Sequence, residues 1–243
     1  MLRSPAPAIA AAPPPTLVEV AYRRLREDII EGRRSAGERL RVEHLREEYG
    51  LGATPLREAL SRLSSEQLVE SIGQRGFRVA SMSLDELADI TEMRVLLEGQ
   101  ALAQSLARGT LEWEARVVAA HHTLSKLDHA LKGGDRPSFS AWEAKNQELH
   151  DALVDACGSP WLLRMRRVLY DQHQRYRWMS IEQKIVPRDV AREHKAIVDA
   201  ALARDVARAC ELTAEHIRET ARVIERVVGP KLGSPPRRRA SKK

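Results

Sequence analysis

The stretch from residue 40 to residue 80 constrains the fold of this chain more than any other. It reads LRVEHLREEYGLGATPLREALSRLSSEQLV and then ESIGQRGFRVA. The first part spaces its apolar residues as two short helices, separated by a tight turn that contains Gly50 and Gly52. The second part alternates as a short hairpin whose basic tip is flanked by glycines. Together these patterns predict a winged helix-turn-helix, which places one helix in the major groove of DNA and a basic loop against the adjacent backbone.

The second of the two helices has one apolar and one polar face. Thr54, Arg57 and Ser61 are spaced three and four residues apart, so they share the outward face, and Arg62 lies beside them. A guanidinium can bind a phosphate or a guanine, so we expect this face to contact DNA, with Arg57 as the main contact. The alternative is a solvated surface in which Arg62 pairs with Glu58. The apolar positions expected to pack the unit are Leu45, Tyr49, Leu51, Leu56, Ala59, Leu60 and Leu63.

The hairpin is predicted to pair residues 69–72 with residues 77–80. Its tip presents Gln74 and Arg75 on a glycine frame, and we expect Arg75 to contact the DNA backbone or the minor groove. The alternative is a plain hairpin that only caps the core. The complete set of expected DNA contacts is Arg41, Thr54, Arg57, Ser61, Arg62, Gln74, Arg75 and Gly76.

After residue 80 the sequence is helical in pattern. Ser83 and Glu86 form a capping box, and no alternating strand pattern follows it. The chain is therefore predicted to be mainly α, with a winged helix-turn-helix domain at 16–80 and an all-α bundle of six or seven helices at 84–228. The expected helices span about 85–108, 110–132, 138–156, 160–180, 188–203 and 205–228.

Composition agrees with a globular intracellular protein that has an anionic partner. The formal net charge is +6, although much of the excess lies in the arginines and lysines after residue 236. The two cysteines, Cys157 and Cys210, lie in apolar helical patterns, which favours free thiols in the cytoplasm. No run of apolar residues is long enough to predict a membrane span. The Ala- and Pro-rich residues 1–15 and the basic residues 229–243 are predicted to be disordered tails.

Polar residues on the inward stripes of the bundle predict its chemistry. Asn146 and His150 lie four residues apart on the inner face of one helix, and His194 and His216 lie on the inner faces of the last two helices, at matching distances from the turn between them. Converging imidazoles can bind zinc or a similar divalent metal. The alternative is that each is a hydrogen-bonded core histidine. The other histidines, including His173, lack this spacing and are expected to be surface or packing residues.

Arg94 also lies on an inward stripe, where a buried guanidinium needs an anion. Glu98, one turn on, can supply it; alternatively, Arg94 binds the carboxylate of a ligand. Arg175 and Tyr176 are candidates for a second carboxylate. A metal-dependent enzyme would use the same histidines, but Asn146 stands where its carboxylate base is expected, so we do not expect an enzyme. A DNA-binding protein without a ligand is the other alternative.

The motifs TPLREALSRL, Leu68-Val69 and QRGFRVA occur in the order and spacing of the N-terminal domain of the GntR family of bacterial transcription regulators. The resemblance extends over residues 17 to 228, where the chain is similar to the branch with an all-helical effector domain, called FCD or FadR-like. Within that branch, the segment RVASMS at 78–83 and the turn ARD at 203–205 resemble the carbon-starvation-induced type of regulator. One departure is that Gly52 and Ala53 stand where the family commonly has a serine-arginine pair.

This resemblance implies a cytoplasmic homodimer that represses transcription from operator DNA and is released by a small carboxylate. The carbon-starvation-induced type implies a dicarboxylate of about five carbons, such as glutarate. Metal-binding members of the family have an acid and three histidines at the positions of Asn146, His150, His194 and His216. An asparagine in place of the acid implies a lower affinity for the metal.

Overall fold

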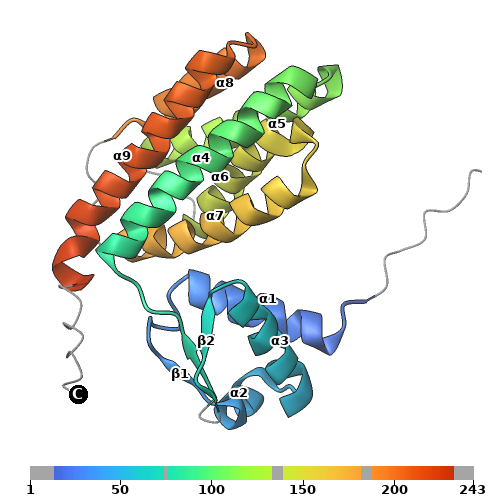
Figure 1. Cartoon of the computed structure of the whole chain (residues 1–243), viewed down its shortest axis with the longest axis vertical. Coiled ribbons are helices and arrows are strands. Elements are labelled where there is room, and N and C mark those ends of the chain that lie inside the picture. The colour runs from blue at the N-terminus through green and yellow to red at the C-terminus, as the bar shows by residue number, and fades with distance from the viewer. Residues whose placement is uncertain (1–13, 74–75, 133–138, 182–187, 233–243) are drawn as a thin grey trace, which may run out of the picture. The chain divides into compact units, whose positions relative to one another are not determined.

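The computed structural model describes residues 14–73, 76–132, 139–181 and 188–232. It divides the chain into two compact units, with the main boundary between Ala80 and Ser81. The first unit combines three helices with short strands, and the second consists of helices (Figure 1).

The first unit is the predicted winged helix-turn-helix. Its elements are α1 (Leu17–Ile30), β1 (Arg39–Leu40), α2 (Val42–Tyr49), α3 (Ala53–Ser65), β2 (Val69–Ser71) and β3 (Phe77–Val79). The hairpin of β2 and β3 pairs Glu70 with Arg78, and β1 adds to the free side of β3 in the antiparallel order β1-β3-β2. The strand β1 was not predicted, because two residues are too few to show an alternating pattern.

The turn between α2 and α3 follows from its glycines. Gly50 ends α2 with a φ of 65°, in the left-handed region where a residue without a Cβ has no steric penalty. Gly52 precedes the first turn of α3. The apolar face of α3 is buried as predicted, through Leu56, Ala59, Leu60 and Leu63.

The second unit is all-helical in its described part, as predicted. Its elements are α4 (Leu84–Arg108), α5 (Leu111–Lys132), α6 (Phe139–Val154), the 3-10 turn η2 (Asp155–Cys157), α7 (Pro160–Ile181), α8 (Val190–Leu202) and α9 (Val206–Leu232). Half of the predicted capping box is present, since the Ser83 side chain accepts a hydrogen bond of 3.1 Å from the backbone N–H of Glu86. The reciprocal bond is replaced, because the backbone N–H of Ser83 and the carboxylate of Glu86 both bind the hydroxyl of Tyr176.

The end of α9 differs from the prediction of a tail from residue 229. The helix continues through Gly229 and Pro230 to Leu232. Leu232 packs against a buried cluster that includes Leu87 and Val228. This packing offsets the cost of a proline, which removes one backbone hydrogen bond from a helix.

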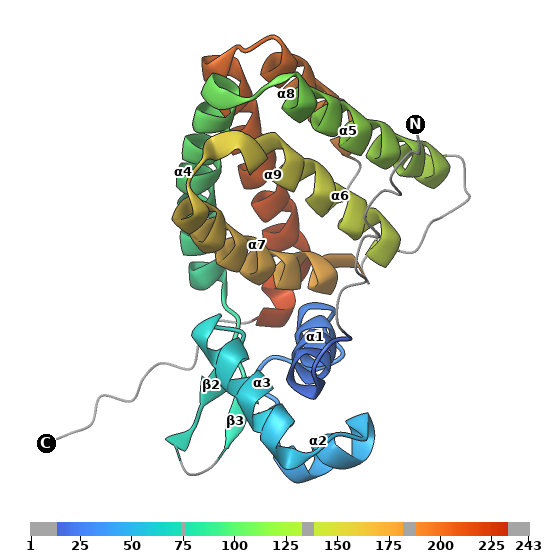
Figure 2. The same ribbon diagram turned by 90° about the vertical axis from the view of Figure 1, so that its right-hand side faces the viewer.

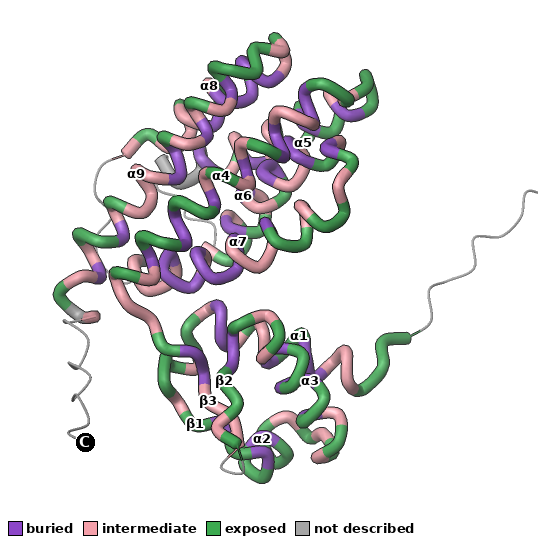
Figure 3. The backbone as a smooth tube through the Cα atoms, in the orientation of Figure 1, coloured by how far each residue is buried: buried purple, intermediate pink, exposed green. Residues whose placement is uncertain are grey.

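The long helices pack side by side. α4 lies against α9 and α7, α5 lies against α6, and α8 lies against α9 (Figures 1 and 2). Buried and exposed stretches alternate along each helix (Figure 3), as expected for amphipathic helices around a shared core. That core includes Leu102, Trp113, Leu149 and Ile197. None of the helices in the described part of the chain is both long and apolar enough to cross a membrane.

Candidate functional site

The outward face of α3 carries the predicted DNA-contacting side chains. Thr54, Arg57 and Ser61 are all exposed. The side chain of Arg57 is 59% exposed, and the nearest carboxylate oxygen, on Glu43, is 4.0 Å away. A weak contact of this kind on the surface stabilises the fold little, so the guanidinium of Arg57 remains available for a phosphate or a base.

Arg62 has a different environment from Arg57. It donates to Glu19 at 3.0 Å, lies 3.5 Å from Glu66, and stacks 3.5 Å above the centroid of the Tyr22 ring. It therefore pairs with Glu19 and Glu66 rather than with Glu58, the partner considered from the sequence. These contacts connect α1 to α3, so Arg62 contributes to the fold of the unit whether or not it touches DNA.

The remaining predicted DNA contacts lie in the wing and before α2. Gly76 has a φ of 93°, a conformation that favours glycine at the base of the hairpin tip. Gln74 and Arg75 lie outside the described residues. Arg41 is exposed and occupies the N-cap position of α2.

Three histidines from three helices meet in the bundle. His150 on α6, His194 on α8 and His216 on α9 are all buried, and their ring centroids lie 4.9 to 5.5 Å apart. One ligand nitrogen from each lies within 4.8 Å of the others. The sequence predicted that His194 and His216 face each other across their helix pair, and the structure brings His150 to the same point.

Burial keeps these rings neutral. It lowers the pKa of His150 and His194 well below the usual value, and the positive charges of neighbouring groups act in the same direction. The pKa of His216 is also lowered by burial, although Glu193 opposes the shift. Neutral imidazole is the form that binds metals, so the cluster offers lone pairs at neutral pH.

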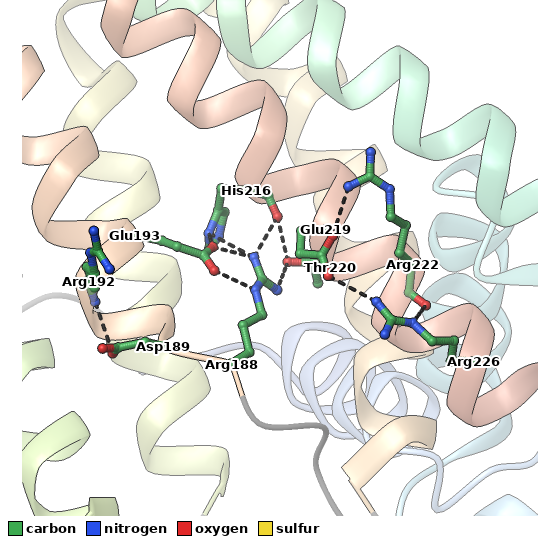
Figure 4. A network of polar contacts seen from close by, with 9 residues as sticks. All are labelled: Arg188, Asp189, Arg192, Glu193, His216, Glu219, Thr220, Arg222 and Arg226. Carbon is green, nitrogen blue, oxygen red and sulfur yellow. Dashed lines mark hydrogen bonds and ion pairs between the residues drawn. The ribbon is translucent and has the colours of Figure 1, made fainter.

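A hydrogen-bond network fixes the ring of His216 (Figure 4). Its Nδ1 lies 2.8 Å from a carboxylate oxygen of Glu193 and 3.4 Å from the guanidinium of Arg188. Because the carboxylate is closer and can only accept, Nδ1 carries the proton and Nε2 keeps its lone pair. Carboxylate-histidine pairs of this kind orient metal ligands in other proteins.

Arg188 in turn holds Glu193. It donates to Glu193 at 2.7 Å, to the hydroxyl of Thr220 at 2.8 Å and to the backbone carbonyl of His216 at 2.9 Å. Burial opposes ionisation of Glu193, but the hydrogen bonds from His216 and Arg188 lower its pKa to about 2. Glu193 is therefore an anion over the whole physiological range.

Several buried polar atoms at the cluster have no hydrogen-bond partner among the described residues. They are both ring nitrogens of His194 and the Oδ1 atom of Asn146. The amide nitrogen of Asn146 donates to the hydroxyl of Tyr170 at 3.2 Å, which leaves Oδ1 as a buried acceptor. An unsatisfied buried polar group costs about 1–3 kcal/mol. Acceptor atoms without a hydrogen-bond donor can bind a cation. A divalent metal ion could therefore be held by Asn146, His150, His194 and His216.

Arg94 lies close to this cluster and is buried, with only 3% of its surface exposed. It donates to Glu98 at 3.1 Å, which is the pairing considered as an alternative from the sequence. Glu98 is shared, however, because Arg166 also donates to it at 2.6 Å. In the described part of the chain the Nε atom of Arg94 has no acceptor. The positive charge of Arg94 contributes to the lowered pKa of His150 and of His216, so it acts at the histidine cluster.

Arg175 and Tyr176, the candidates for a second carboxylate, make contacts within the protein. Arg175 donates to Gln172 on its own helix at 2.9 Å. The hydroxyl of Tyr176 accepts from the backbone N–H of Ser83 at 3.1 Å and donates to Glu86 at 2.5 Å. These contacts tie Tyr176 of α7 to the start of α4, and the role of Arg175 and Tyr176 in binding a carboxylate stays a prediction.

Sequence reasoning missed the polar inner face of α7, which is formed by Arg166, Tyr170, His173 and Arg177. The ring of Tyr170 has the guanidinium carbons of Arg94 and Arg177 at 4.9 and 4.8 Å from its centroid. Its hydroxyl donates to Glu143 at 3.1 Å. The spacing of four, three and four residues was a signal for one helical face, but the many other arginines of this helix obscured it.

Comparison with known proteins identifies both units. Residues 17–79 match the model of bacterial regulatory proteins of the gntR family, and residues 89–219 match the FCD domain. The chain is 43% identical to the HTH-type transcriptional regulator BphR of Paraburkholderia xenovorans, over 86% of this chain and 85% of that protein. It is 40% identical to the HTH-type transcriptional repressor GlaR of Escherichia coli, over 85% of this chain and 95% of that protein.

The fold has solved counterparts. The structure of E. coli McbR/YncC superimposes with a TM-score of 0.72 at 22% identity, covering 87% of this chain and 98% of that one. The relatives are transcription regulators and not enzymes, so the enzyme alternative is not supported. The chain belongs to the GntR family and is a DNA-binding transcription regulator with an FCD effector-binding domain.

Proposed function

We propose that this regulator is a cytoplasmic, homodimeric repressor that a small dicarboxylate releases from its operator. The effector binds in the helical unit, at a divalent metal held by the histidine cluster. The observation that supports this most is the set of three buried, neutral histidines whose ligand nitrogens lie within 4.8 Å of one another. Repression is supported by the similarity to GlaR, which is named a transcriptional repressor.

The ligand set favours zinc or a similar divalent metal with an anion completing it. Three imidazole nitrogens suit zinc and its neighbours, and the Oδ1 atom of Asn146 can add a fourth donor. All four protein ligands are neutral. The double positive charge of the metal would therefore attract an anionic effector strongly in this buried site.

Arg94 is the residue we assign to the effector carboxylate. It is buried, and its positive charge lowers the pKa of His150 and of His216. Its Nε–H lacks an acceptor among the described residues. A charge-assisted hydrogen bond to a carboxylate would satisfy this donor. α4 carries Arg94, and it begins four residues after the boundary between the two units. A shift of α4 on effector binding is therefore a direct route to the DNA-binding unit.

The effector must favour one arrangement of the regulator over another in order to change DNA affinity. Coupling energies between sites are typically about 1–3 kcal/mol, which corresponds to a change in operator affinity of about 5- to 150-fold. We expect glutarate, as a five-carbon dicarboxylate, to lower the affinity by a factor in this range.

Dimerisation is supported by exposed apolar side chains on two helices that pack together. Met93 and Leu96 on α4 are 41% and 62% exposed, and Trp161 and Met165 on α7 are 67% and 48% exposed. Exposed apolar side chains that form one contiguous patch are typical of an interface, and we propose that these four contribute to such a patch. Two copies would also match the two-fold symmetry of an operator.

The proposal is tested by melting the protein with a panel of carboxylates, before and after treatment with a chelator. Glutarate should raise the melting temperature of the metal-loaded protein and lose this effect once the metal is removed. Asn146→Asp should bind the metal more tightly and gain less from the carboxylate, because the new charge compensates the metal. A glutarate effect that survives the chelator contradicts a metal-held effector. Operator binding that ignores every acid in the panel favours the ligand-independent alternative.

A further inference from the structure

His173 on α7 lies outside the three-histidine cluster and is completely buried, with 0% of its surface exposed. Its Nδ1 lies 3.0 Å from a terminal nitrogen of Arg177. A guanidinium can only donate, so Nδ1 must accept and the ring proton resides on Nε2. This Nε2–H has no hydrogen-bond partner in the described part of the chain. The protein therefore holds a buried donor that points at no acceptor of its own.

The position of this donor is fixed by a second layer of contacts. Arg177 donates to both carboxylate oxygens of Glu143, at 3.2 Å through its Nε and by a closer contact through Nη2. Arg177 also lies over the ring of Tyr170. Since a guanidinium held on two sides cannot rotate freely, the acceptor role of the His173 Nδ1 is fixed, and so is the direction of Nε2–H.

The surroundings of His173 are positively charged and adjoin the histidine cluster. Burial lowers its pKa well below the usual value, and the charges of Arg94 and Arg177 act in the same direction, together with His216. The ring of Tyr170 connects these groups, because it contacts Arg94 and Arg177 and lies 6.2 Å from the ring of His150. A neutral donor among cations is suited to an oxygen of an anion.

We infer that His173 donates a hydrogen bond from Nε2 to a carboxylate of the effector and thereby selects dicarboxylates over monocarboxylates. The inference rests on the proposed function, because it concerns the acid bound at the same site. Arg94 and the metal site can satisfy one carboxylate, whereas the His173 donor requires a further acceptor oxygen. An acid that ends in a methyl group would leave this donor without a partner, and such a loss is costly in a buried site.

Two substitutions separate this role from a structural one. In His173→Gln the side-chain amide reaches the position of Nε2, so the donor to the effector is kept while the contact with Arg177 is lost. In His173→Asn the amide reaches only the position of Nδ1, so the contact with Arg177 is kept and the donor is lost. The affinity of the metal-loaded, full-length protein for glutarate and for butyrate is then measured by calorimetry, with metal content and melting temperature as controls.

We expect His173→Gln to bind glutarate within about threefold of the original protein, and His173→Asn to bind it about 10- to 100-fold more weakly, as for the loss of a hydrogen bond to a charged group. Butyrate affinity and metal content should be the same in both variants. Glutarate binding by His173→Asn at the original affinity overturns the inference. So does an equal loss in both variants with a lower melting temperature, which shows a structural role.

A measurement on the unsubstituted protein covers the case in which a variant fails to fold. Long-range proton-nitrogen NMR spectra of the histidine rings should show His173 protonated on Nε2, with a resonance that shifts when glutarate is added. A proton on Nδ1, or a resonance that glutarate leaves in place while it binds, overturns the role of His173 alone. If neither glutarate nor any other acid of the panel binds, the proposed function fails and this inference fails with it.

Discussion

The polar side chains that we assign to DNA binding and those that we assign to ligand binding differ in their exposure to water. On α3 of the DNA-binding unit the side chain of Arg57 is 59% exposed, whereas in the helical unit the guanidinium of Arg94 and the rings of His150 and His194 are almost completely buried. Water satisfies the exposed groups when no DNA is bound. The buried groups depend on the protein or on a ligand, so each of them influences stability as well as binding.

In the DNA-binding unit, recognition can therefore be altered without a change in the stability of the fold. In the helical unit it cannot. A substitution of Thr54, Arg57 or Ser61 on the exposed face of α3 should change DNA affinity alone. A substitution in the buried site should change ligand binding and stability together, and in some cases in opposite directions. Changes of pH and substitutions in the two units test this contrast.

The pH dependence of unfolding should be large in the helical unit. Burial lowers the pKa of His150, His173 and His194 well below the value of about 6.5 that they have in the unfolded chain. Below pH 6.5 the unfolded state binds more protons than the folded state, so the free energy of unfolding falls as the pH is lowered. The contribution of these histidines is constant above about pH 7.5. Each histidine should contribute about 1.4 kcal/mol per pH unit below 6.5.

Urea denaturation of the metal-free protein at pH 7.5 and 5.5 measures this loss. Hydrogen exchange in the full chain then separates the units. Amides of α4, α8 and α9 should lose protection at pH 5.5, after correction for the intrinsic exchange rate, more than amides of α2 and α3, where His44 is exposed. Equal losses of protection in both units would contradict the contrast.

His194→Leu should separate binding from stability in the buried site. The substitution removes a metal ligand, so metal affinity should fall by about 100-fold or more, which exceeds the loss typical of residues that only hydrogen-bond to a ligand. The response to glutarate should disappear. The same substitution removes two buried ring nitrogens that have no partner among the described residues, so the metal-free protein should be as stable or more stable. Metal titration and thermal unfolding measure the two effects. A strongly destabilised metal-free variant would show that His194 is mainly a packing residue.

Arg57→Ala should weaken operator binding by about 30-fold or more, because one base contact is worth about 1–3 kcal/mol and a dimer loses one in each half-site. Its melting temperature should not change, since the side chain is mostly exposed. Electrophoretic mobility shifts with operator DNA measure the affinity. Arg62→Ala is the matched control, because it breaks the contacts with Glu19 and Tyr22 and should lower stability. If Arg57→Ala leaves DNA binding intact, α3 is not the recognition helix.

Glu193→Gln should have the smallest effect. The amide keeps the size of the side chain but removes the charge that holds His216 in the tautomer with a free Nε2. Metal affinity should fall about tenfold, the lower end of the range for outer-shell partners. Metal competition assays at pH 7.5 measure it. Glu219→Gln is the control, because Glu219 is a partly exposed residue of α9 that pairs with Arg222 and Arg226. An unchanged affinity would show that His216 does not depend on Glu193.

Much of the fold could be predicted from the sequence because the helices are long and amphipathic. The N-cap at Ser83, the apolar face of α3 and the inward histidines all follow from local spacing. Short or irregular features could not be predicted, such as the two-residue strand β1 and the extension of α9 through Pro230. Their stability comes from partners distant in the sequence.

The candidate site could be predicted only in part, for a related reason. The inward direction of His150, His194 and His216 is a property of each helix, and the structure brings them together as the spacing predicted. The contacts of Arg62 with Glu19 and of Tyr176 with Ser83 join residues far apart in the chain, and no local pattern indicates them. On α7, arginines on every side hid the buried stripe that contains His173.

The asparagine at position 146 has a consequence for signalling. None of the protein's metal ligands in the proposed site carries a negative charge. The bound acid should therefore strengthen metal binding, and by linkage the bound metal strengthens binding of the acid by the same factor. At low concentrations neither would stay bound at the site alone. The regulator would then act as a coincidence detector, relieving repression only in a cell that contains both the available metal and the organic acid.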